Sequence, residues 1–319
     1  MRLALAVSGK RTARDAVHVA QLAEEHGLDE VWLTEDYVER GAFAVAGAVL
    51  AATRTVTVGI GVVNPWTRHP VLTAMEAGAL QELAPGRVVL GLGASNARWM
   101  EHQLGIPFVR PLTRLRDSVR MVRSALDEGV VDHDGEYGRV RADMSFRPPG
   151  SVPVVLGVKG PRALELAGEV ADGVLLSVLS SPAYVSWALD RIGTTLPRGV
   201  ASYVAVSYDP DRAVARDRIR PFAATFLGIH GDHSITRVAG LDPLQAAALR
   251  DGWHAGAPRV DLVNDDVLDT FTVAGDRDDL ATGLHRLVNA GLDVAVVHDQ
   301  MEPDLPALLD AVRAAVRLR

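Results

Sequence analysis

The feature that most constrains the fold is a repeated alternation along the chain. Short runs of apolar, often β-branched residues are separated by longer segments of helical periodicity, and strands that alternate with helices form parallel sheets with right-handed crossovers. The apolar runs number eight and lie at 3–7, 30–34, 55–63, 87–92, 152–158, 173–177, 200–207 and 293–298. Eight such units predict an α/β protein with a closed (β/α)₈ (TIM) barrel.

The segments between these runs have the spacing and end signals of helices. They lie at 12–27, 42–53, 71–83, 111–127, 161–170, 182–192, 279–290 and 306–316. Two insertions interrupt the repeat, one at 129–150 before the fifth strand and a mostly helical one at 209–274 between the seventh and eighth strands. No linker or low-complexity tract divides the chain, so we expect a single domain over 1–319.

Composition narrows the class of partner. The formal net charge is −7, which disfavours nucleic acid and anionic membranes as partners. The chain contains no cysteine, which excludes disulfides and thiol nucleophiles. No apolar run approaches the roughly 18 residues of a membrane span, and the N-terminal run is too short for a signal peptide. We expect a cytoplasmic protein that acts on a small molecule.

Polar residues gather where the predicted strands end. In a (β/α)₈ barrel the active site is built at the carboxyl ends of the strands. The polar clusters that follow strands lie at 8–10, 35–37, 61–70, 93–96, 159–161, 177–178 and 298–300. This distribution predicts an enzyme or a ligand-binding protein.

Lys159, Gly160 and Pro161 are suited to binding an anion. A glycine and a proline open a helix whose free amides and positive dipole end favour negative charge, and Lys159 can add its own charge. Phosphate groups are commonly bound at this rim of such barrels. The alternative is an ordinary helix start with proline at its first position.

Glu35 and Asp36 place two carboxyl groups at the barrel mouth. If one is partly buried, it can hold a proton and act as a general acid. The alternative is a solvated helix cap, a role that aspartate commonly fills. His69 precedes a proline that begins a helix and is expected to cap it, and no set of His, Asp and Glu residues has convincing metal-binding spacing.

Four segments resemble a known family. They are EDYVER at 35–40, GVVNPWTRHP at 61–70, VLGLG at 89–93 and ADG at 171–173. Together they resemble the luciferase-like flavin and deazaflavin oxidoreductases, and more closely the branch of coenzyme F420-dependent methylenetetrahydromethanopterin reductases. The resemblance extends over nearly the whole chain. The NPWTRHP segment is specific to this branch, whereas the two glycine motifs are shared across the superfamily.

The resemblance implies an activity and a cofactor site. It implies an F420-dependent oxidoreductase, commonly a homodimer, that transfers a hydride between the deazaflavin C5 and a small organic substrate, with C=C or C=N reduction favoured. A bulge with a non-prolyl cis peptide at Gly61–Val62 would back the deazaflavin ring, and Asn64 would contact its pyrimidine edge. Ala94 and Ser95 would lie beside the cofactor, and Lys159, Gly160 and Pro161 would hold its phosphate.

The sequence departs from the family at one point. Where the family usually has an Asp-His pair after strand two, this chain has Glu35 and Asp36. Asp36 could replace the histidine as proton donor only if burial raises its pKa. Two alternatives stay open: an FMN-dependent monooxygenase on the same barrel, against which NPWTRHP argues, and a binding protein without catalytic activity.

Overall fold

The computed structural model describes residues 1–36, 38–298 and 303–317. Within them, eight parallel strands close into a barrel in the order β1-β12-β9-β8-β7-β4-β3-β2. The strands are β1 (Arg2–Val7), β2 (Glu30–Leu33), β3 (Thr57–Val63), β4 (Val88–Gly93), β7 (Val154–Gly157), β8 (Gly173–Leu176), β9 (Gly199–Val204) and β12 (Val294–His298). The predicted (β/α)₈ barrel is therefore confirmed, and each predicted strand has a counterpart.

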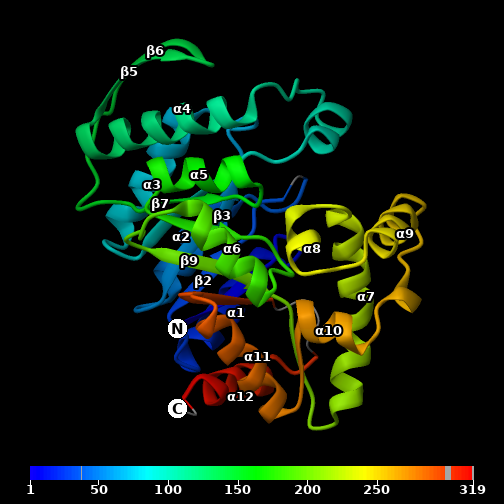
Figure 1. Ribbon diagram of the computed structural model, residues 1–319. Coiled ribbons are helices and arrows are strands. Elements are labelled where there is room, and N and C mark those ends of the chain that lie inside the picture. Colours follow the sequence, from blue (N-terminus) through cyan, green and yellow to red (C-terminus); the bar gives the residue numbers. More distant parts are fainter. Residues whose placement is uncertain (37, 299–302, 318–319) are drawn as a thin grey trace.

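Helices surround this barrel (Figure 1). They are α1 (Ala13–Glu25), α2 (Ala42–Ala52), α3 (Pro70–Leu83), α4 (Pro111–Arg123), α5 (Pro161–Val170), α6 (Pro182–Ile192), α11 (Arg277–Asn289) and α12 (Leu305–Arg317). The predicted helix over 111–127 ends as an α-helix at Arg123 and continues as the π-helical turn η2 (Ser124–Glu128). In the described ranges, no helix combines the length and the apolar character that crossing a membrane requires.

The amino-terminal end of the barrel is closed by a buried ion cluster. The Glu30 side chain is only 2% exposed and accepts hydrogen bonds from Arg2, from Arg198 at 2.8 Å and from Trp32 Nε1 at 2.8 Å. A buried carboxylate is tolerated when charged and polar partners compensate for its lost hydration. Apolar side chains such as Val89, Val155, Leu175 and Val296 fill the barrel interior above this cluster. The site of such a barrel is therefore expected at the carboxyl ends of the strands.

The first insertion is a β-hairpin. Strands β5 (Val130–Gly135) and β6 (Gly138–Asp143) pair antiparallel and stand beside α4 (Figure 1). The sequence predicted an insertion here but not its structure. Its turn carries Tyr137, whose hydroxyl donates to the Pro65 carbonyl at 2.8 Å. The hairpin therefore reaches back to the segment that follows β3.

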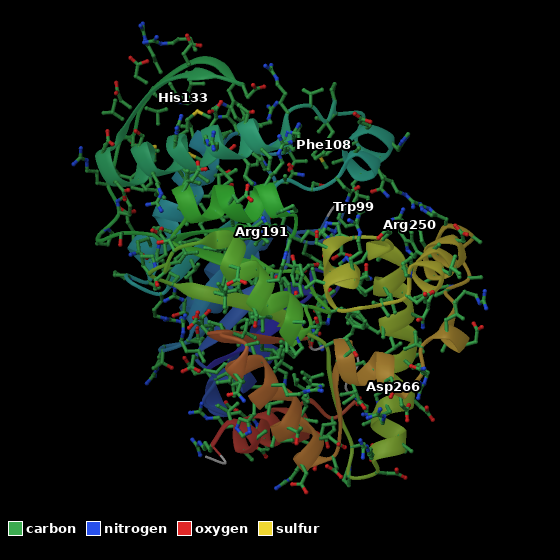
Figure 2. The ribbon with its side chains drawn as sticks, viewed as in Figure 1. Trp99, Phe108, His133, Arg191, Arg250 and Asp266 are labelled. Atoms are coloured by element: carbon green, nitrogen blue, oxygen red, sulfur yellow. The ribbon has the colours of Figure 1, made fainter. Side chains whose placement is uncertain are left out.

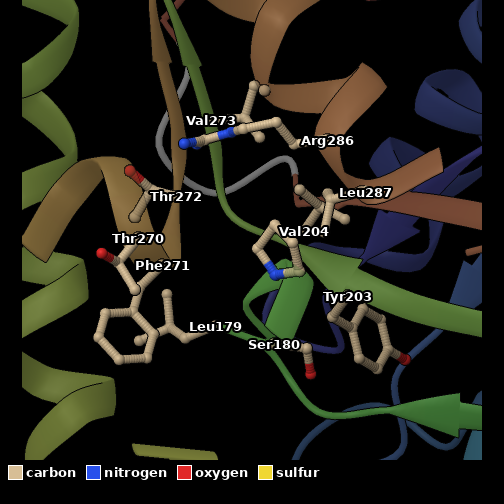
Figure 3. Close-up of a pocket in the computed structure, with 12 residues that line it drawn as sticks. Leu179, Ser180, Tyr203, Val204, Thr270, Phe271, Thr272, Val273, Arg286 and Leu287 are labelled. Carbon is tan, nitrogen blue, oxygen red and sulfur yellow. The ribbon is translucent and has the colours of Figure 1, made fainter. Parts of the chain in front are cut away.

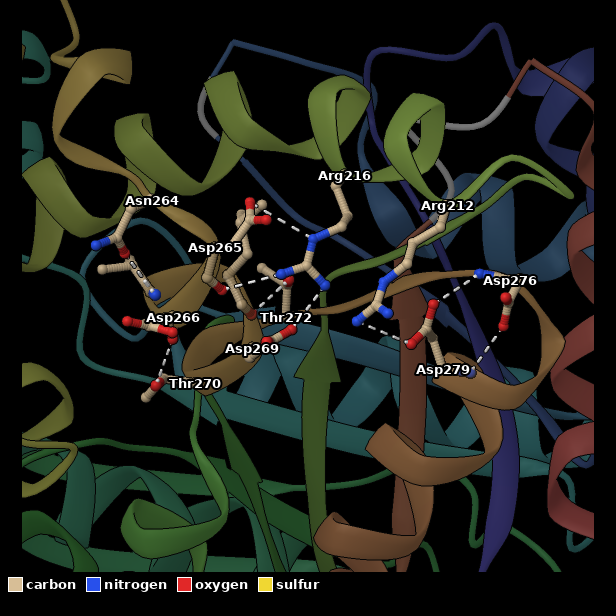
Figure 4. A network of polar contacts seen from close by, with 12 residues as sticks. Arg212, Arg216, Asn264, Asp265, Asp266, Asp269, Thr270, Thr272, Asp276 and Asp279 are labelled. Atoms are coloured by element: carbon tan, nitrogen blue, oxygen red, sulfur yellow. Dashed lines mark hydrogen bonds and ion pairs between the residues drawn. The ribbon is translucent and has the colours of Figure 1, made fainter.

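The second insertion forms a helical layer at one side of the barrel, as predicted. It contains α7 (Arg212–His230), α8 (Ser234–Val238), α9 (Pro243–His254), the 3₁₀ turn η3 (Val260–Leu262) and α10 (Asp265–Phe271). Arg216 on α7 bonds Asp269 at 2.8 Å, and Arg212 lies 3.3 Å from Asp279 (Figure 4). These ion pairs join α7 to α10 and α11.

The seventh predicted strand is divided in the structure. The sequence predicted one strand over 200–207, but β9 leaves the barrel after Val204. A second strand, β10 (Val206–Tyr208), pairs in parallel with β11 (Val273–Gly275) outside the barrel. The prediction was wrong here because a continuous apolar run does not reveal a change of pairing partner at Ala205.

Candidate active site at the carboxyl end of the barrel

The third strand ends in a bulge. Its register with β4 shifts between Ile60 and Val63, and the Gly61–Val62 peptide is cis, as predicted. A side chain at Gly61 would place its first carbon 2.8 Å from Trp32 and from the Tyr203 hydroxyl, so only glycine fits. The Tyr203 hydroxyl donates to the Gly61 carbonyl at 2.8 Å and holds the bulge from across the barrel.

Three glycines of β4 and β7, which we call the glycine floor, lie next to the Val62 side chain. A first side-chain carbon at Gly91, Gly93 or Gly157 would lie 3.0, 2.4 or 2.7 Å from a Val62 methyl group. The distances at Gly93 and Gly157 are too short for any side chain, and a side-chain carbon at Gly91 would also lie 2.4 Å from the Ile60 carbonyl oxygen. The glycines of β4 and β7 therefore make room for Val62, and the GLG motif has a packing role at this position.

Side chains of the NPWTRHP segment form hydrogen bonds that hold the turn at the mouth of the barrel. The Asn64 side chain is 4% exposed, and its carbonyl oxygen accepts from the Trp66 amide at 2.7 Å. His69 Nδ1 accepts from the Val71 amide at 3.3 Å, so its predicted capping role is confirmed. The Asn64 amide serves the turn in this structure, and its contact with a cofactor ring stays a prediction.

The large aromatic residue of this segment joins three parts of the chain. The rings of Trp66 and Phe108 lie 4.7 Å apart, and the Arg114 guanidinium lies 5.2 Å from Trp66 and 4.3 Å from Tyr137. Phe108 belongs to the loop that leads into α4 (Figure 2). A packed aromatic and cation–π cluster of this kind adds stability beyond its buried area, so it fixes the outer side of the bulge.

Both carboxylate oxygens of Glu35 make contacts that hold neighbouring elements together. One carboxylate oxygen lies 3.2 Å from Arg68 of the NPWTRHP segment, and the other accepts from the Ala42 amide at the start of α2 at 3.1 Å. Arg68 also bonds Glu76 on α3 at 2.7 Å. Glu35 thus connects three elements, and its catalytic role stays a prediction.

Asp36 has surroundings suited to holding a proton. The residue as a whole is exposed to solvent, although neighbouring protein atoms crowd its carboxyl group. Burial raises the pKa of Asp36, a hydrogen bond with Thr34 and the charge of Lys10 lower it, and the charge of Glu35 raises it. The direction of this shift is the one that a proton donor requires, and the catalytic role of Asp36 stays a prediction. Three residues of the predicted rim, Tyr37, Asp299 and Gln300, lie outside the described residues.

The predicted anion site has the expected local structure. Helix α5 begins at Pro161, no side chain caps it, and a side chain at Gly160 would meet no atom within 4 Å. Burial lowers the pKa of Lys159, and the Tyr184 hydroxyl donates to the Lys159 carbonyl at 2.6 Å. An uncapped helix start thus follows directly after a partly buried lysine, an arrangement suited to binding an anion.

Two histidines near Lys159 were not identified as site residues from the sequence. His230 is 4% exposed, Nε2 donates to the Val178 carbonyl at 3.0 Å, and Nδ1 finds no hydrogen-bond partner in the described part of the chain. Burial and then the charge of Lys159 lower the pKa of His230 to about 3 and that of His233 to about 4. Both come from the helical insertion, far from any strand end, so local patterning could not indicate them.

Ser95 carries a second unpartnered polar atom. Its backbone has φ of 63°, a region that non-glycine residues seldom occupy. Its hydroxyl is buried and has no partner among the described residues. Ala94, beside it, is partly buried. An unusual backbone together with an unsatisfied hydroxyl fits a site that a polar ligand completes.

On the far side of the mouth, at the end of β12, the His298 side chain is uncharged at neutral pH. Burial and then Lys10 lower the pKa of His298 to about 4, and its ring packs 5.3 Å from Phe222 and 6.5 Å from Tyr203. A cavity of about 10 Å³ lies behind Tyr203, whose hydroxyl points away from it (Figure 3). That volume holds no more than about one water molecule, so the cavity is not a substrate site.

Comparisons with known proteins agree with this fold. The model of a family described as luciferase-like monooxygenase matches residues 2–294. A 5,10-methylenetetrahydromethanopterin reductase of Archaeoglobus fulgidus is 32% identical over 304 residues, 90% of each chain. An F420-dependent glucose-6-phosphate dehydrogenase of Rhodococcus erythropolis is 29% identical over 314 residues, 89% of this chain and 87% of the relative. The solved F420-dependent tetrahydromethanopterin reductase of Methanopyrus kandleri has a TM-score of 0.86 at 26% identity and covers 98% and 96% of the two chains.

Proposed function

Because the chain belongs to the luciferase-like monooxygenase family, we propose that it is a coenzyme F420-dependent oxidoreductase. It transfers a hydride between the deazaflavin C5 and a small organic substrate, and reduction of a C=C or C=N bond is the favoured direction. The observation that carries the proposal is the TM-score of 0.86, over 98% of this chain, to an F420-dependent reductase. The named relatives differ in substrate, so the proposal does not extend to one compound.

The described residues fit this cofactor. Lys159 and the uncapped start of α5 at Gly160 and Pro161 would hold its phosphate, with the free Nδ1 of His230 nearby. Ser95, with Ala94, would offer its unpartnered hydroxyl. The Gly61–Val62 bulge would lie behind the ring, and Asn64 would lie near the ring's edge.

In this mechanism the protein supplies position and a proton, and the bound deazaflavin supplies the hydride. Tyr203 and the glycine floor hold the bulge in one place. An Asp36 carboxyl oxygen gives its proton to the substrate atom next to the carbon that accepts the hydride. In the oxidative direction the same oxygen takes that proton back.

We also propose that the enzyme is a homodimer and acts in the cytoplasm. Helix α3 exposes a stripe of large apolar side chains, Leu72, Met75 and Leu83, which are 51%, 44% and 53% exposed. Alanines at 44, 48 and 51 form the exposed face of the neighbouring helix α2. An apolar face over two adjacent helices is typical of a protein interface, and a second copy of the chain would cover it.

The test is titration of the purified protein with F420 and, separately, with FMN, followed by fluorescence at low salt. We expect F420 to bind with a Kd at least about tenfold lower than that of FMN, a difference of about 1.4 kcal/mol. Tighter binding of FMN would overturn the proposal and favour a flavin monooxygenase. F420 that binds but is never reduced or oxidised would favour a binding protein.

A further inference from the structure

The inward-facing residues of β12 end in a histidine at the barrel mouth. Alternate residues of a strand point to the same side, and Val294 and Val296 belong to the cluster that fills the barrel interior. His298 is the next residue in this series and the last of β12. It pairs in register with Ala6 of β1, another inward-facing residue. The imidazole therefore faces the barrel axis beside a small side chain, at the carboxyl end where the site of such a barrel lies.

Aromatic contacts relate this imidazole to the bulge on the other side of the barrel. The His298 ring lies 5.3 Å from the ring of Phe222 on α7 and 6.5 Å from that of Tyr203 on β9, the strand next to β12. The Tyr203 hydroxyl donates to the Gly61 carbonyl of the bulge at 2.8 Å. One tyrosine side chain thus spans the distance from this wall to the bulge. A flat ligand ring that rests against the bulge would therefore come up against the imidazole.

The hydrogen-bonding groups of His298 are unused. The residue is 9% exposed, Nδ1 is buried, and no hydrogen bond joins either ring nitrogen to another of the described residues. The buried His230, by contrast, uses its Nε2 atom on the Val178 carbonyl. Because its pKa is lowered, the His298 imidazole is neutral at pH 7 and offers one N–H donor and one acceptor. A buried polar side chain without partners is costly and uncommon, so a further group is expected to complete it.

We propose that His298 is a ring-contacting residue of the cofactor site, and that its imidazole N–H donates a hydrogen bond to a polar atom of the cofactor ring. This inference rests on the proposed function. Carbonyl oxygens and ring nitrogens of a deazaflavin or flavin are acceptors that suit a neutral imidazole. The bulge at Gly61 and Val62 would support the ring from one wall and His298 from the other. Two such supports fix the orientation that hydride transfer requires.

The first test follows the nitrogens of His298 directly. Protein labelled with ¹⁵N-histidine is titrated with F420, and NMR records each imidazole nitrogen while cofactor fluorescence records saturation. His298→Phe identifies the His298 signals by their loss. His285 on α11 is the control, because its Nε2 is also buried without a partner among the described residues but belongs to the outer helical layer. We expect the His298 signals to shift in step with saturation and those of His285 to stay in place.

The second test measures affinity in matched variants. His298→Phe keeps an aromatic ring beside Phe222 and loses both nitrogens, so the Kd for F420 should rise about fivefold, equivalent to about 1 kcal/mol. His298→Asn places an amide nitrogen near the position of Nδ1 and should bind within about twofold of the wild type. His285→Phe should bind as the wild type does. Thermal unfolding verifies that each variant is folded.

The outcomes separate this inference from the proposed function. Unchanged His298 signals at saturating F420, or wild-type affinity in His298→Phe, would overturn the inference and leave the proposed function intact. Binding of FMN in place of F420 would reject the proposed function, and the His298 signals followed with FMN would then decide the inference in the same way. Binding of neither compound would reject both.

Discussion

The Tyr203 hydroxyl controls the shape of the mouth through one hydrogen bond, to the Gly61 carbonyl. Tyr203→Phe removes the donor and leaves that carbonyl unpaired, which costs about 1 kcal/mol. We therefore expect the Kd for F420 to rise about fivefold, measured by fluorescence titration. Tyr208→Phe, on β10 outside the barrel, is the matched control and should bind as the wild type does. An unchanged Kd in Tyr203→Phe would show that the bulge keeps its position without this bond.

Individual site residues differ in how well the sequence could reveal them. Glu35, Asp36 and Lys159 were predicted as site residues because each lies at the end of a predicted strand. Tyr203 and His230 were not found, because Tyr203 lies inside a strand and meets Gly61 over a separation of 142 residues, and His230 ends a helix of the insertion. Glu39 belonged to the EDYVER segment, but its close approach to Gly9 joins two separate loops and could not be predicted from that segment.

At the scale of elements, the start of α5 allows a direct test of the anion site. Gly160→Asp would place a carboxylate beside the free amides of α5, where a side chain has open space. Repulsion of the phosphate should abolish measurable F420 binding by fluorescence titration, while the thermal midpoint changes little. Gly160→Asn, similar in size but uncharged, should retain most of the affinity. Equal affinity in the aspartate variant and the wild type would reject the phosphate assignment.

Helix α1 is joined to the segment before β3 by one carboxylate. Burial alone would raise the pKa of Glu24, but amides of Thr55, Arg54 and Val56 donate to it and lower the pKa to about 2. Because the pKa of Glu24 is lower in the folded protein than in the unfolded chain, the ionised carboxylate stabilises the fold at pH values above the unfolded pKa of about 4.3. This stabilisation is lost as the pH falls toward 2.

Glu24→Gln should therefore destabilise the protein by about 1 to 2 kcal/mol at pH 7, after allowance for solvent screening. The difference from the wild type should shrink steadily between about pH 5 and pH 2. Urea unfolding at a series of pH values measures it, with Glu25→Gln as the exposed control. A difference that is constant over this range would show that the carboxylate charge is not responsible.

Elements were predicted best where their periodicity is regular. The eight barrel strands and their helices have clear apolar periods, because both faces of a parallel sheet are buried. The β5-β6 hairpin was missed, because most of its side chains are exposed or half-buried and give no clear alternation. Likewise, the end of β9 at Val204 depends on the position of β11, about 70 residues further along the chain.

At the scale of the whole molecule, the exposed faces of α2 and α3 predict an assembly. Leu72→Asp together with Met75→Asp would place charges in the proposed interface. We expect light scattering with size exclusion to give twice the chain mass of 34.1 kDa for the wild type and the monomer mass for the double variant. Leu244→Asp, at a site on α9 that is 81% exposed, should stay dimeric. A wild type that is monomeric at all concentrations would reject the homodimer.

The single domain over 1–319 also stays a prediction.

The glycine floor under Val62 has an evolutionary consequence. Because a side chain at Gly93 or Gly157 would collide with the methyl groups of Val62, a substitution at either glycine is harmful while valine stands at 62. The same substitution becomes acceptable once a smaller residue has replaced that valine. Positions 62, 93 and 157 are therefore epistatic, and the order in which mutations arise decides which neighbouring sequences can be reached. A mutant library that varies the glycines one at a time would find only harmful changes, whereas one that varies them together with position 62 would include the compatible combinations.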